Sequence, residues 1–360
     1  PQIYQRVIDN ALWGFVRRHQ ENDKQMQLIG DQEALEAAEI TQSKDFELPL
    51  DVPVARDVFH TGIVVDSDTV PIIYRRSYID DINFGADNWD KLCNMLQLLL
   101  ESFRYWRITI SLPKSVFGKR KVDFLSHIIS REGTEAAPRN LDSIMAMPFP
   151  TRLKSVQKFV GSLIYYHRFI ENFATYAAAL YELKDAQLIA GEGLDKAKVA
   201  FTELKKKLTA APILRHADPA KDYSIILYAN AWAIGATICQ THDDMLFPVR
   251  FISRVLKDAE TRYLDNEKEV LALLKTLDVG FEMLAGHAIT VYSRYSTLKW
   301  LFTSKSLHGR ALQWATILSP WQLTIIRCNE IPVALTALLT ASITPFKHFD
   351  EALEAIAPIK

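Results

Sequence analysis

The apolar and polar positions of the first third predict a hairpin followed by a helix. The apolar stretch Val70–Tyr74 and its continuation at Ile82 and Phe84 flank the polar string Tyr-Ile-Asp-Asp at residues 78–81, which is typical of two strands joined by a turn. The segment Trp89–Trp106 then predicts an amphipathic helix, because its apolar residues recur every three or four positions. These residues are Leu92, Met95, Leu96 and Leu99.

Two further strand-like runs follow this helix. They span Arg107–Leu112 and Val122–Ile129, and a turn that contains Gly118 joins them. The first third therefore has the predicted order hairpin, helix, hairpin. An acidic segment at about residues 20–70 lacks a sustained apolar period, which indicates a solvated insertion or a partly disordered loop.

A new unit is predicted after Pro148 and Pro150, since each proline lacks an amide donor and restrains the residue before it. A helix follows, with Lys154, Gln157 and Lys158 directed away from its apolar face. That face carries Val156, Phe159, Val160, Leu163 and Ile164.

The second half predicts strands that alternate with helices. Gly191-Glu-Gly193 marks a linker, and the lysine-rich helix Lys196–Leu208 follows it. A second helix is expected over Glu267–Leu284. The predicted strands span Tyr223–Tyr228, Ile234–Gln240, Pro248–Ser253, Ile289–Ser293 and Trp321–Cys328.

Size and composition indicate a globular protein with two or three domains. The chain has 360 residues and a mass of 41.0 kDa, enough for several cores. Its 49% hydrophobic and 24% charged residues are typical of folded chains. The formal net charge of −1 is unusual for a protein that encloses nucleic acid. The clusters Lys119-Arg120-Lys121 and Lys205-Lys206-Lys207 are either solvated faces or local phosphate contacts.

Cysteine, histidine and apolar patterns exclude several classes of protein. Cys93, Cys239 and Cys328 lie far apart, which argues against a zinc site or a disulfide scaffold. The nine histidines show no ligand spacing. No apolar run reaches membrane-spanning length and no secretory start is present, so we expect an intracellular protein, cytoplasmic or nuclear, without a membrane partner.

Several strings of the sequence resemble motifs of one family, and they follow one another in the same order as in that family. The strings PQIYQRVIDNALWGF, YIDD, ISLPKSVFGKRKVDFLSHIISREG and VQKFVGSLIYYHRFIENFATYAAALYEL are similar to the reverse transcriptase of gypsy-type LTR retrotransposons. The later strings LYANAWAIGATICQ, FPVRFISRVLKDAETRYLDNEKEVLALL and ITVYSRYSTLKWL resemble the RNase H domain tethered to that polymerase.

The resemblance implies an α+β multidomain fold with a partial reverse transcriptase palm, a small helical thumb and an RNase H-like mixed α/β domain. The expected bounds are residues 1–135 for the palm with its acidic insertion, 136–192 for the thumb and connection helices, 193–340 for the RNase H-like domain and 341–360 for a C-terminal tail.

The resemblance also implies a polymerase site at the first hairpin. Asp80 corresponds to the metal-binding acid, Asp81 to its neighbour and Tyr78 to the aromatic residue beside the primer end. Without the resemblance, two acids between strands are also an ordinary polar turn. Ser126 replaces a glycine of the family, which makes close backbone approach harder. Further substrate-binding positions are Gln5, Lys114, Phe124, His127 and Arg168.

We expect the polymerase metal site to be incomplete in this chain. Two-metal phosphoryl transfer places ions roughly 4 Å apart, and each Mg²⁺ takes several oxygen ligands. The family supplies a third carboxylate from an earlier strand, and Pro1 aligns with a motif that follows that strand. Asp80 and Asp81 therefore form half of a magnesium site, which an upstream polymerase half would complete.

The RNase H resemblance implies four acids around two magnesium ions, of which one remains. Glu269 matches the acid of the helix, whereas the first Asp falls at Tyr228, or at Asn230 after a shift of two residues. The next Asp falls at Arg294 and the last, loosely, at Leu335. Because arginine stays protonated in proteins, it would repel a metal ion.

Two interpretations of Glu269 remain open. It is either a surface residue of its helix or the partner of Arg294 in an ion pair across the former metal site. Such a pair would keep the fold while ending the chemistry.

The string YYHRF at residues 165–169 matches the thumb of the family. Tyr165 and Phe169 are interpreted as packing residues of the core. Lys154, Lys158 and Arg168 are candidates for contacts with backbone phosphates.

Two functional hypotheses follow. The chain is either an RNA-directed DNA polymerase and RNase H fragment, with Mg²⁺ as cofactor and an RNA–DNA hybrid or primer-template as partner, or a non-catalytic or co-opted remnant that at most binds such a duplex. Because the first polymerase Asp and three of four RNase H acids are missing, we expect a catalytically inert descendant of the enzyme.

Overall fold

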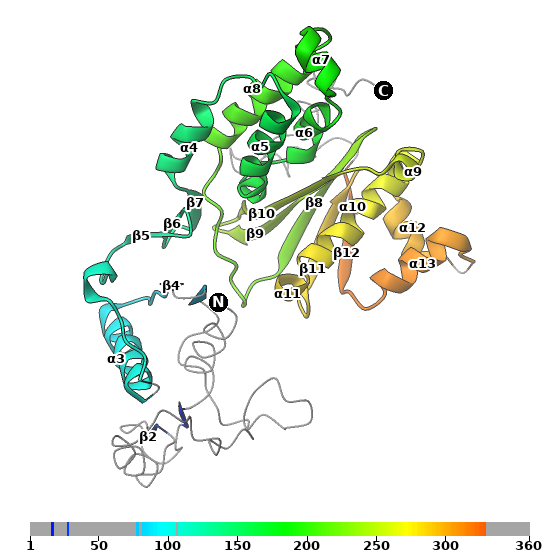
Figure 1. Cartoon of the computed structure of the whole chain (residues 1–360). Coiled ribbons are helices and arrows are strands. Elements are labelled where there is room, and N and C mark those ends of the chain that lie inside the picture. The colour runs from blue at the N-terminus through cyan, green and yellow to red at the C-terminus, as the bar shows by residue number, and fades with distance from the viewer. Residues whose placement is uncertain are drawn as a thin grey trace, which may run out of the picture. The chain divides into compact units, whose positions relative to one another are not determined.

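The computed structural model describes residues 16–17, 27–28, 77–78, 81–105, 107–304 and 306–328. The chain divides into two compact units, Pro1–Lys119 and Arg120–Lys360, which are described separately (Figure 1). The domain bounds expected from the sequence stay predictions. Several expectations lie outside the described residues: Gln5, Val70–Tyr74, Asp80, Leu335, most of the acidic insertion and the tail 341–360.

In the first unit two short strands pair antiparallel on either side of residues 79–80, as predicted. β3 (Ser77–Tyr78) pairs with β4 (Asp81–Ile82), and Tyr78 lies opposite Asp81. Two other short strands, β1 (Val16–Arg17) and β2 (Gln27–Leu28), also pair antiparallel.

The amphipathic helix predicted after this hairpin is confirmed as α3 (Trp89–Tyr105). Its apolar face buries Leu99 and Phe103, and Ile82 and Phe84 from the hairpin pack against them. Burial of this face is what stabilises a helix of this length, because helical propensity alone contributes little.

The strand predicted over Arg107–Leu112 is wrong. Arg107 adopts a left-handed conformation with φ of 52°, and the amide of Ile108 donates to the carbonyl of Phe103 at 2.8 Å. The chain therefore turns back on α3, and Leu112–Lys114 forms a 3₁₀ turn, η3. Pro113 within η3 has no amide to donate to a strand partner.

The second unit begins with three antiparallel strands. β5 (Lys121–Phe124) pairs with β6 (His127–Ser130), which pairs with β7 (Thr134–Ala136). The single strand predicted over Val122–Ile129 is therefore a hairpin. Its two-residue turn, Leu125-Ser126, has φ of 48° and 61°, values that glycine and asparagine adopt most easily.

A layer of helices follows these strands in the chain (Figure 1). The helix predicted after Pro150 is α5, and it buries Val156, Phe159, Val160 and Leu163. Ile164 was expected on the same face but is half-exposed, because it is the last helical residue before the chain changes direction. The elements are α4 (Pro138–Met145), α5 (Leu153–Ile164), η4 (His167–Phe169), α6 (Phe173–Tyr181), α7 (Asp185–Ala190) and α8 (Asp195–Thr209).

Among the described residues, five strands form a mixed sheet in the order β10-β9-β8-β11-β12. β8, β9 and β10 are antiparallel neighbours, whereas β11 runs parallel to both β8 and β12. All five strands predicted in the second half of the chain are thus present. Their bounds are β8 (Tyr223–Ala229), β9 (Ala233–His242), β10 (Met245–Val255), β11 (Ile289–Ser293) and β12 (Leu323–Arg327).

The helix predicted over Glu267–Leu284 is interrupted at Gly280. A Cβ atom there would lie 2.8 Å from Cδ1 of Leu284 and 3.0 Å from the carbonyl oxygen of Thr276, so a larger residue would crowd both neighbours. The helices of this region are α9 (Asp258–Thr261), α10 (Asp265–Val279), α11 (Phe281–Leu284), α12 (Thr297–Thr303) and α13 (Gly309–Leu318).

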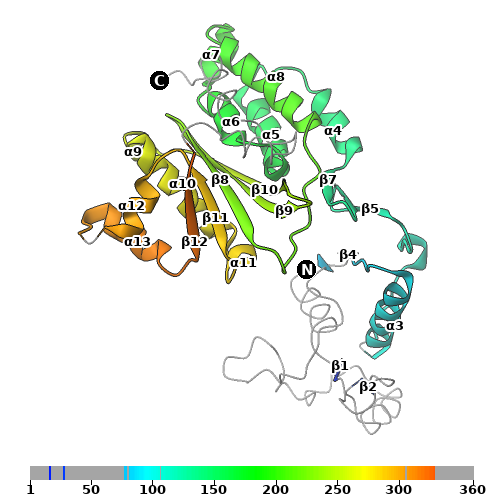
Figure 2. The same ribbon diagram turned by 180° about the vertical axis from the view of Figure 1, so that it is seen from behind.

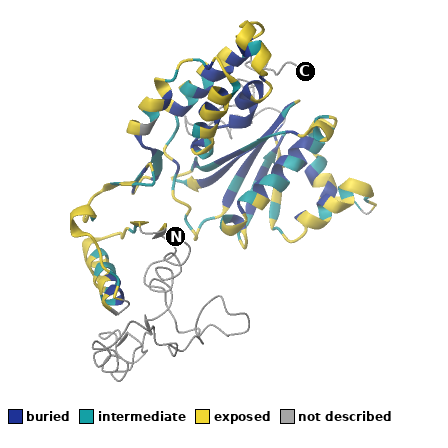
Figure 3. Cartoon of the chain, viewed as in Figure 1, coloured by how far each residue is buried: buried dark blue, intermediate teal, exposed yellow. Residues whose placement is uncertain are grey.

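Helices cover both faces of this sheet (Figure 2). Alternation along β8 sends Ile225 and Leu227 into the core shared with α10 and α13, and Ile226 and Tyr228 into the core shared with α5, α6 and α8. Most residues of β8 and β9 are therefore buried (Figure 3), as expected for strands covered on both sides.

Candidate functional site

The remaining RNase H-like acid lies where α10 meets the end of β11. Glu269 is in the first half of α10 and is fully buried. Ser293 is the last residue of β11, and Arg294 follows it. The interpretation of Glu269 as a surface residue is wrong, because α10 packs this side of its helix against the sheet.

Both oxygen atoms of Glu269 accept hydrogen bonds from the end of β11. Oε1 accepts from Nε of Arg294 at 2.8 Å. Oε2 accepts from the hydroxyl of Ser293 at 2.6 Å and from the backbone amide of Arg294 at 3.0 Å. The ion pair proposed from the sequence is therefore present.

The guanidinium of Arg294 also contacts β8. Nη2 donates to the carbonyl oxygen of Ala229 at 2.5 Å, and the guanidinium carbon lies 5.6 Å from the ring centre of Tyr228. Tyr228 is the position at which the first acid of the family is predicted to fall without a gap. The structure thus brings together Tyr228, Glu269 and Arg294, three of the predicted site positions.

Asn230, the alternative position for the first acid, has a structural role. Its Oδ1 accepts from the backbone amides of Trp232 at 3.0 Å and Ala233 at 2.7 Å. These bonds close the turn between β8 and β9, as Asn commonly does.

Electrostatics at this site oppose a magnesium ion. Burial raises the pKa of Glu269, and hydrogen bonds from Arg294 and Ser293 lower it by less. A metal ion would have to displace the guanidinium from the one carboxylate that remains. The residues present do not fit two magnesium ions, which need several carboxylate oxygens. Across the described part of the chain, no three His, Cys, Asp or Glu residues cluster in a way that would hold a metal.

Three of the residues predicted for the polymerase lie in the described part of the first unit. Tyr78 and Asp81 are exposed on the paired strands β3 and β4, and Lys114 is exposed in η3. The roles of these residues, and of Asp80 and Gln5, stay predictions.

His127 and Phe124 lie at the turn of the β5–β6 hairpin. The His127 ring is buried and stacks on Phe169 with 5.3 Å between ring centres, while Nδ1 lies 2.6 Å from the carbonyl oxygen of Leu125. Burial and the charge of Arg168 lower the pKa of His127. The hairpin is therefore fixed to η4 of the helical layer.

Tyr165 and Phe169 behave differently from each other. Phe169 is buried, as predicted. Tyr165 is 48% exposed, so its interpretation as a core residue is wrong. Its hydroxyl instead donates to the carbonyl of Leu125, and its ring lies 5.0 Å from that of His127.

The basic cluster at residues 205–207 is mostly structural. Lys205 donates to the carbonyl oxygens of Met145, at 2.9 Å, and Met147, and Lys207 lies over the ring of Tyr176 at 5.0 Å. Lys206 is exposed and pairs with Glu203 at 2.7 Å. These contacts connect α8 to α4 and α6.

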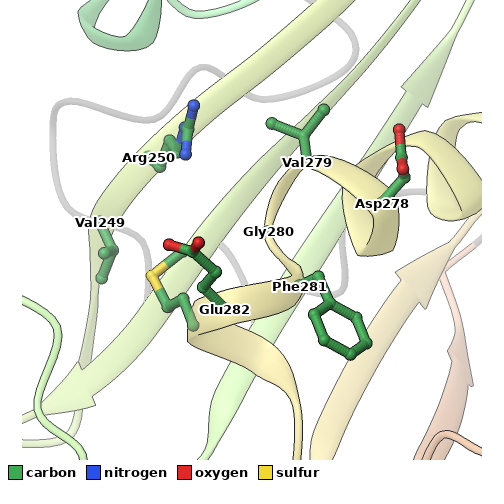
Figure 4. A pocket seen from close by; sticks show the side chains of 8 residues that line it. Val249, Arg250, Asp278, Val279, Gly280, Phe281 and Glu282 are labelled. Atoms are coloured by element: carbon green, nitrogen blue, oxygen red, sulfur yellow. The ribbon is translucent and has the colours of Figure 1, made fainter. Parts of the chain in front are cut away.

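A pocket of about 480 Å³ lies beside the edge strand β10. Val249 and Arg250 line it from the strand, and Gly280, Phe281 and Glu282 line it from the helical turn between α10 and α11 (Figure 4). Arg250 is a residue that sequence reasoning missed, since an isolated arginine in a strand carries no motif. Ser293 was missed as well, although it precedes Arg294 in the quoted string.

The mixed sheet is that of an RNase H-like domain of a reverse transcriptase. Residues 195–291 match the family described as "RNase H-like domain found in reverse transcriptase". The Pol polyproteins of the Drosophila melanogaster transposons opus and 297 are 29% and 30% identical, over 72% and 71% of this chain and 28% and 24% of their own lengths. The chain belongs to the retrotransposon Pol polyproteins and covers part of their reverse transcriptase region. It spans about a quarter of the length of these curated relatives.

Solved structures of a foamy viral protease-reverse transcriptase share the fold. One, in complex with double-stranded DNA, aligns with a TM-score of 0.60 over 71% of this chain and 46% of that chain. Another, in complex with an RNA/DNA hybrid, aligns with a TM-score of 0.56 over 74% and 37%. Both are 22% identical, so they confirm the α+β fold alone. None of the helices within the described ranges is long and apolar enough to cross a membrane.

Proposed function

We propose that this chain is the thumb and RNase H-like part of a retroelement reverse transcriptase, and that it holds an RNA–DNA duplex without cleaving the RNA strand. The ion pair between Arg294 and Glu269 supports the proposal that the RNA strand is not cleaved. RNase H chemistry needs metal ions to activate water and to stabilise the leaving oxygen. A guanidinium bonded to the last acid leaves no place for those ions.

Similarity to reverse transcriptases solved with double-stranded DNA and with an RNA/DNA hybrid supports a duplex partner. A domain that has lost its metal ligands can still contact a duplex, because phosphate contacts do not depend on the cleavage chemistry. The partner is therefore an RNA–DNA hybrid or a primer-template.

The hairpin of β3 and β4 supports a second candidate function in the first unit. Asp81 is exposed at this hairpin, opposite Tyr78. Asp80 and Asp81 would supply part of a magnesium site for polymerisation, and further oxygen ligands are needed to complete it. Primer extension by the chain alone is not expected, and extension that Asp80→Ala abolishes would overturn this reading.

Cleavage of RNA in a labelled hybrid tests the main proposal. With Mg²⁺ present, the wild-type chain should bind the hybrid at low salt, lose affinity steeply as salt rises and leave the RNA intact. Glu269→Gln is the matched control, since it removes the only remaining acid but keeps its shape. RNA cleavage by the wild type that is absent in Glu269→Gln would overturn the proposal. Hybrid binding that does not depend on salt would contradict the proposal that the chain holds a duplex.

A further inference from the structure

Four side-chain nitrogen atoms in the described part of the second unit are buried without a hydrogen-bond partner, and one of them is Nε2 of His242. The other three are Nε2 of His127, Nε of Arg168 and Nε of Arg250. They come from the β5–β6 hairpin, from η4 and from β10. η4 packs against β10, and the His127 ring stacks on Phe169 next to Arg168. The two arginine Nε atoms are donors, and buried donors are nearly always satisfied in native proteins. Nε2 of His127 is an acceptor instead, because Nδ1 of the neutral ring donates to the carbonyl oxygen of Leu125.

The two arginines also repel each other as like charges. Burial lowers the pKa of Arg168, and the charge of Arg250 lowers it further. The charge of Arg168 in turn lowers the pKa of His127. Among the described residues, no carboxylate offsets these effects on Arg168, Arg250 or His127.

Nearby acids have other partners or lie in water. Asp278 lines the pocket beside Arg250, but its carboxylate pairs with Lys275 at 2.6 Å. Glu282 is exposed on α11. The charge of Glu171 acts on Lys207 and Tyr176.

The backbone of β10 is irregular next to Arg250. The register with β9 shifts between Pro248 and Arg250, so that Val249 is an extra residue in the strand. Bulges of this kind often redirect a side chain near a functional site. Here the bulge immediately precedes an arginine whose Nε has no acceptor.

We propose that Arg168 and Arg250 form an anion site that binds a phosphate group. Arginine suits this ligand, because its planar guanidinium donates parallel hydrogen bonds to phosphate oxygens. An oxyanion would satisfy the unpaired donors and offset the repulsion between the cations. The source we assign is a backbone phosphate of the duplex, and this assignment rests on the proposed function.

Thermal unfolding with inorganic phosphate tests the site itself. The melting temperature of the wild type should rise with phosphate, compared with chloride at matched ionic strength, because a ligand stabilises the state that binds it. Arg250→Gln should melt at a higher temperature than the wild type in phosphate-free buffer and should lose the phosphate-dependent rise. If Arg250 has only a structural role, Arg250→Gln should instead melt at a lower temperature than the wild type in phosphate-free buffer.

Two further variants keep this test decisive. Arg262→Gln removes an exposed arginine of the same unit and should respond to phosphate as the wild type does. Arg168→Gln should lose the response, as Arg250→Gln does. If Arg250→Gln and Arg168→Gln both keep the wild-type response, or if the wild type shows none, the anion site is overturned.

Hybrid binding over a range of salt concentrations tests the source of the phosphate. Loss of one phosphate contact should reduce the slope of log affinity against log salt by about one in Arg250→Gln, but not in Arg262→Gln. An unchanged slope, together with a lost phosphate response, would assign the site to free phosphate and overturn the duplex source. A wild type that binds no hybrid but keeps the phosphate response would refute the proposed function and the duplex source, and leave the anion site standing.

Discussion

Nε of Arg294 lies 2.8 Å from Oε1 of Glu269, whose side chain is 1% exposed. The positive charge is thus fixed at the position where the resemblance predicts a metal-binding acid. This explains how the fold persists without the metal, because the buried carboxylate keeps a charged partner and three hydrogen bonds. The same contacts oppose the chemistry that the fold performs in an intact enzyme.

Removing Arg294 should be strongly destabilising. Arg294→Ala leaves the carboxylate of Glu269 buried without a cation, which costs about 3–5 kcal/mol in comparable pairs. Urea unfolding of the wild type and the variant measures this loss. Arg262→Ala, which removes an exposed arginine, should change the free energy of unfolding by less than about 0.5 kcal/mol.

The two residues of the pair should be energetically coupled. The double variant Glu269→Leu/Arg294→Leu should be more stable than the sum of the two single effects predicts, because the first substitution removes the charge that the second would leave unpaired. A double-mutant cycle from urea unfolding gives the coupling energy. Additive effects would mean that the pair contributes nothing as a pair.

Stability should depend on pH through Glu269. Burial raises the pKa of Glu269 above its ordinary value of 4.5, so the folded state keeps a proton that the unfolded chain has released. The contribution of Glu269 to the free energy of unfolding therefore falls as pH rises from 4.5 to the raised value. Glu269→Gln does not titrate and should gain stability relative to the wild type across this window. Urea unfolding on both sides of the window measures the difference, and a difference that is independent of pH would contradict it.

Replacing Ser126 by glycine should stabilise the β5–β6 hairpin. Ser126 has φ of 61°, and the left-handed conformation costs a residue with a Cβ atom about 1–2 kcal/mol. Part of this gain is lost to the greater freedom of glycine in the unfolded chain, so a net gain of up to about 1 kcal/mol is expected. Ser296→Gly is the control: Ser296 has φ of −80°, and this substitution should destabilise. Thermal unfolding of both variants gives the comparison.

The Tyr165 hydroxyl should help to hold this hairpin against the helical layer. Tyr165→Phe removes its bond to the carbonyl of Leu125, which should cost about 0.5–1.5 kcal/mol and speed amide hydrogen exchange in β5 and β6. Tyr181→Phe, a change at another half-exposed tyrosine, should leave exchange in these strands unchanged. Equal exchange in the wild type and Tyr165→Phe would contradict the role.

Regular elements with strong periodicity were predictable from the sequence, and turns were not. α3, α5 and the strands of the mixed sheet follow patterns of apolar residues that local sequence shows directly. The run Arg107–Leu112 looks like a strand but folds back on α3, because the amide of Ile108 bonds to Phe103 and its side chain packs against the buried face of α3. The hairpin turn at Leu125-Ser126 contains no glycine, so nothing in the local sequence indicated it.

The altered acid site was predictable in part. The charges of Glu269 and Arg294, together with the family resemblance, indicated the ion pair. Burial of Glu269 was not predictable, because an isolated Glu in an amphipathic helix is usually exposed. Arg250 gave no signal at all, since its significance depends on η4, which lies about 80 residues earlier in the chain and approaches β10 only in the fold.

Isothermal titration of Mg²⁺ into the wild type and Glu269→Gln tests the central claim most directly. The first unit with Asp80 and Asp81 is identical in both proteins, so any difference in heat reports the site of Arg294 and Glu269. We predict identical titrations, because the guanidinium already occupies the carboxylate. Binding of magnesium by the wild type that disappears in Glu269→Gln would contradict the account.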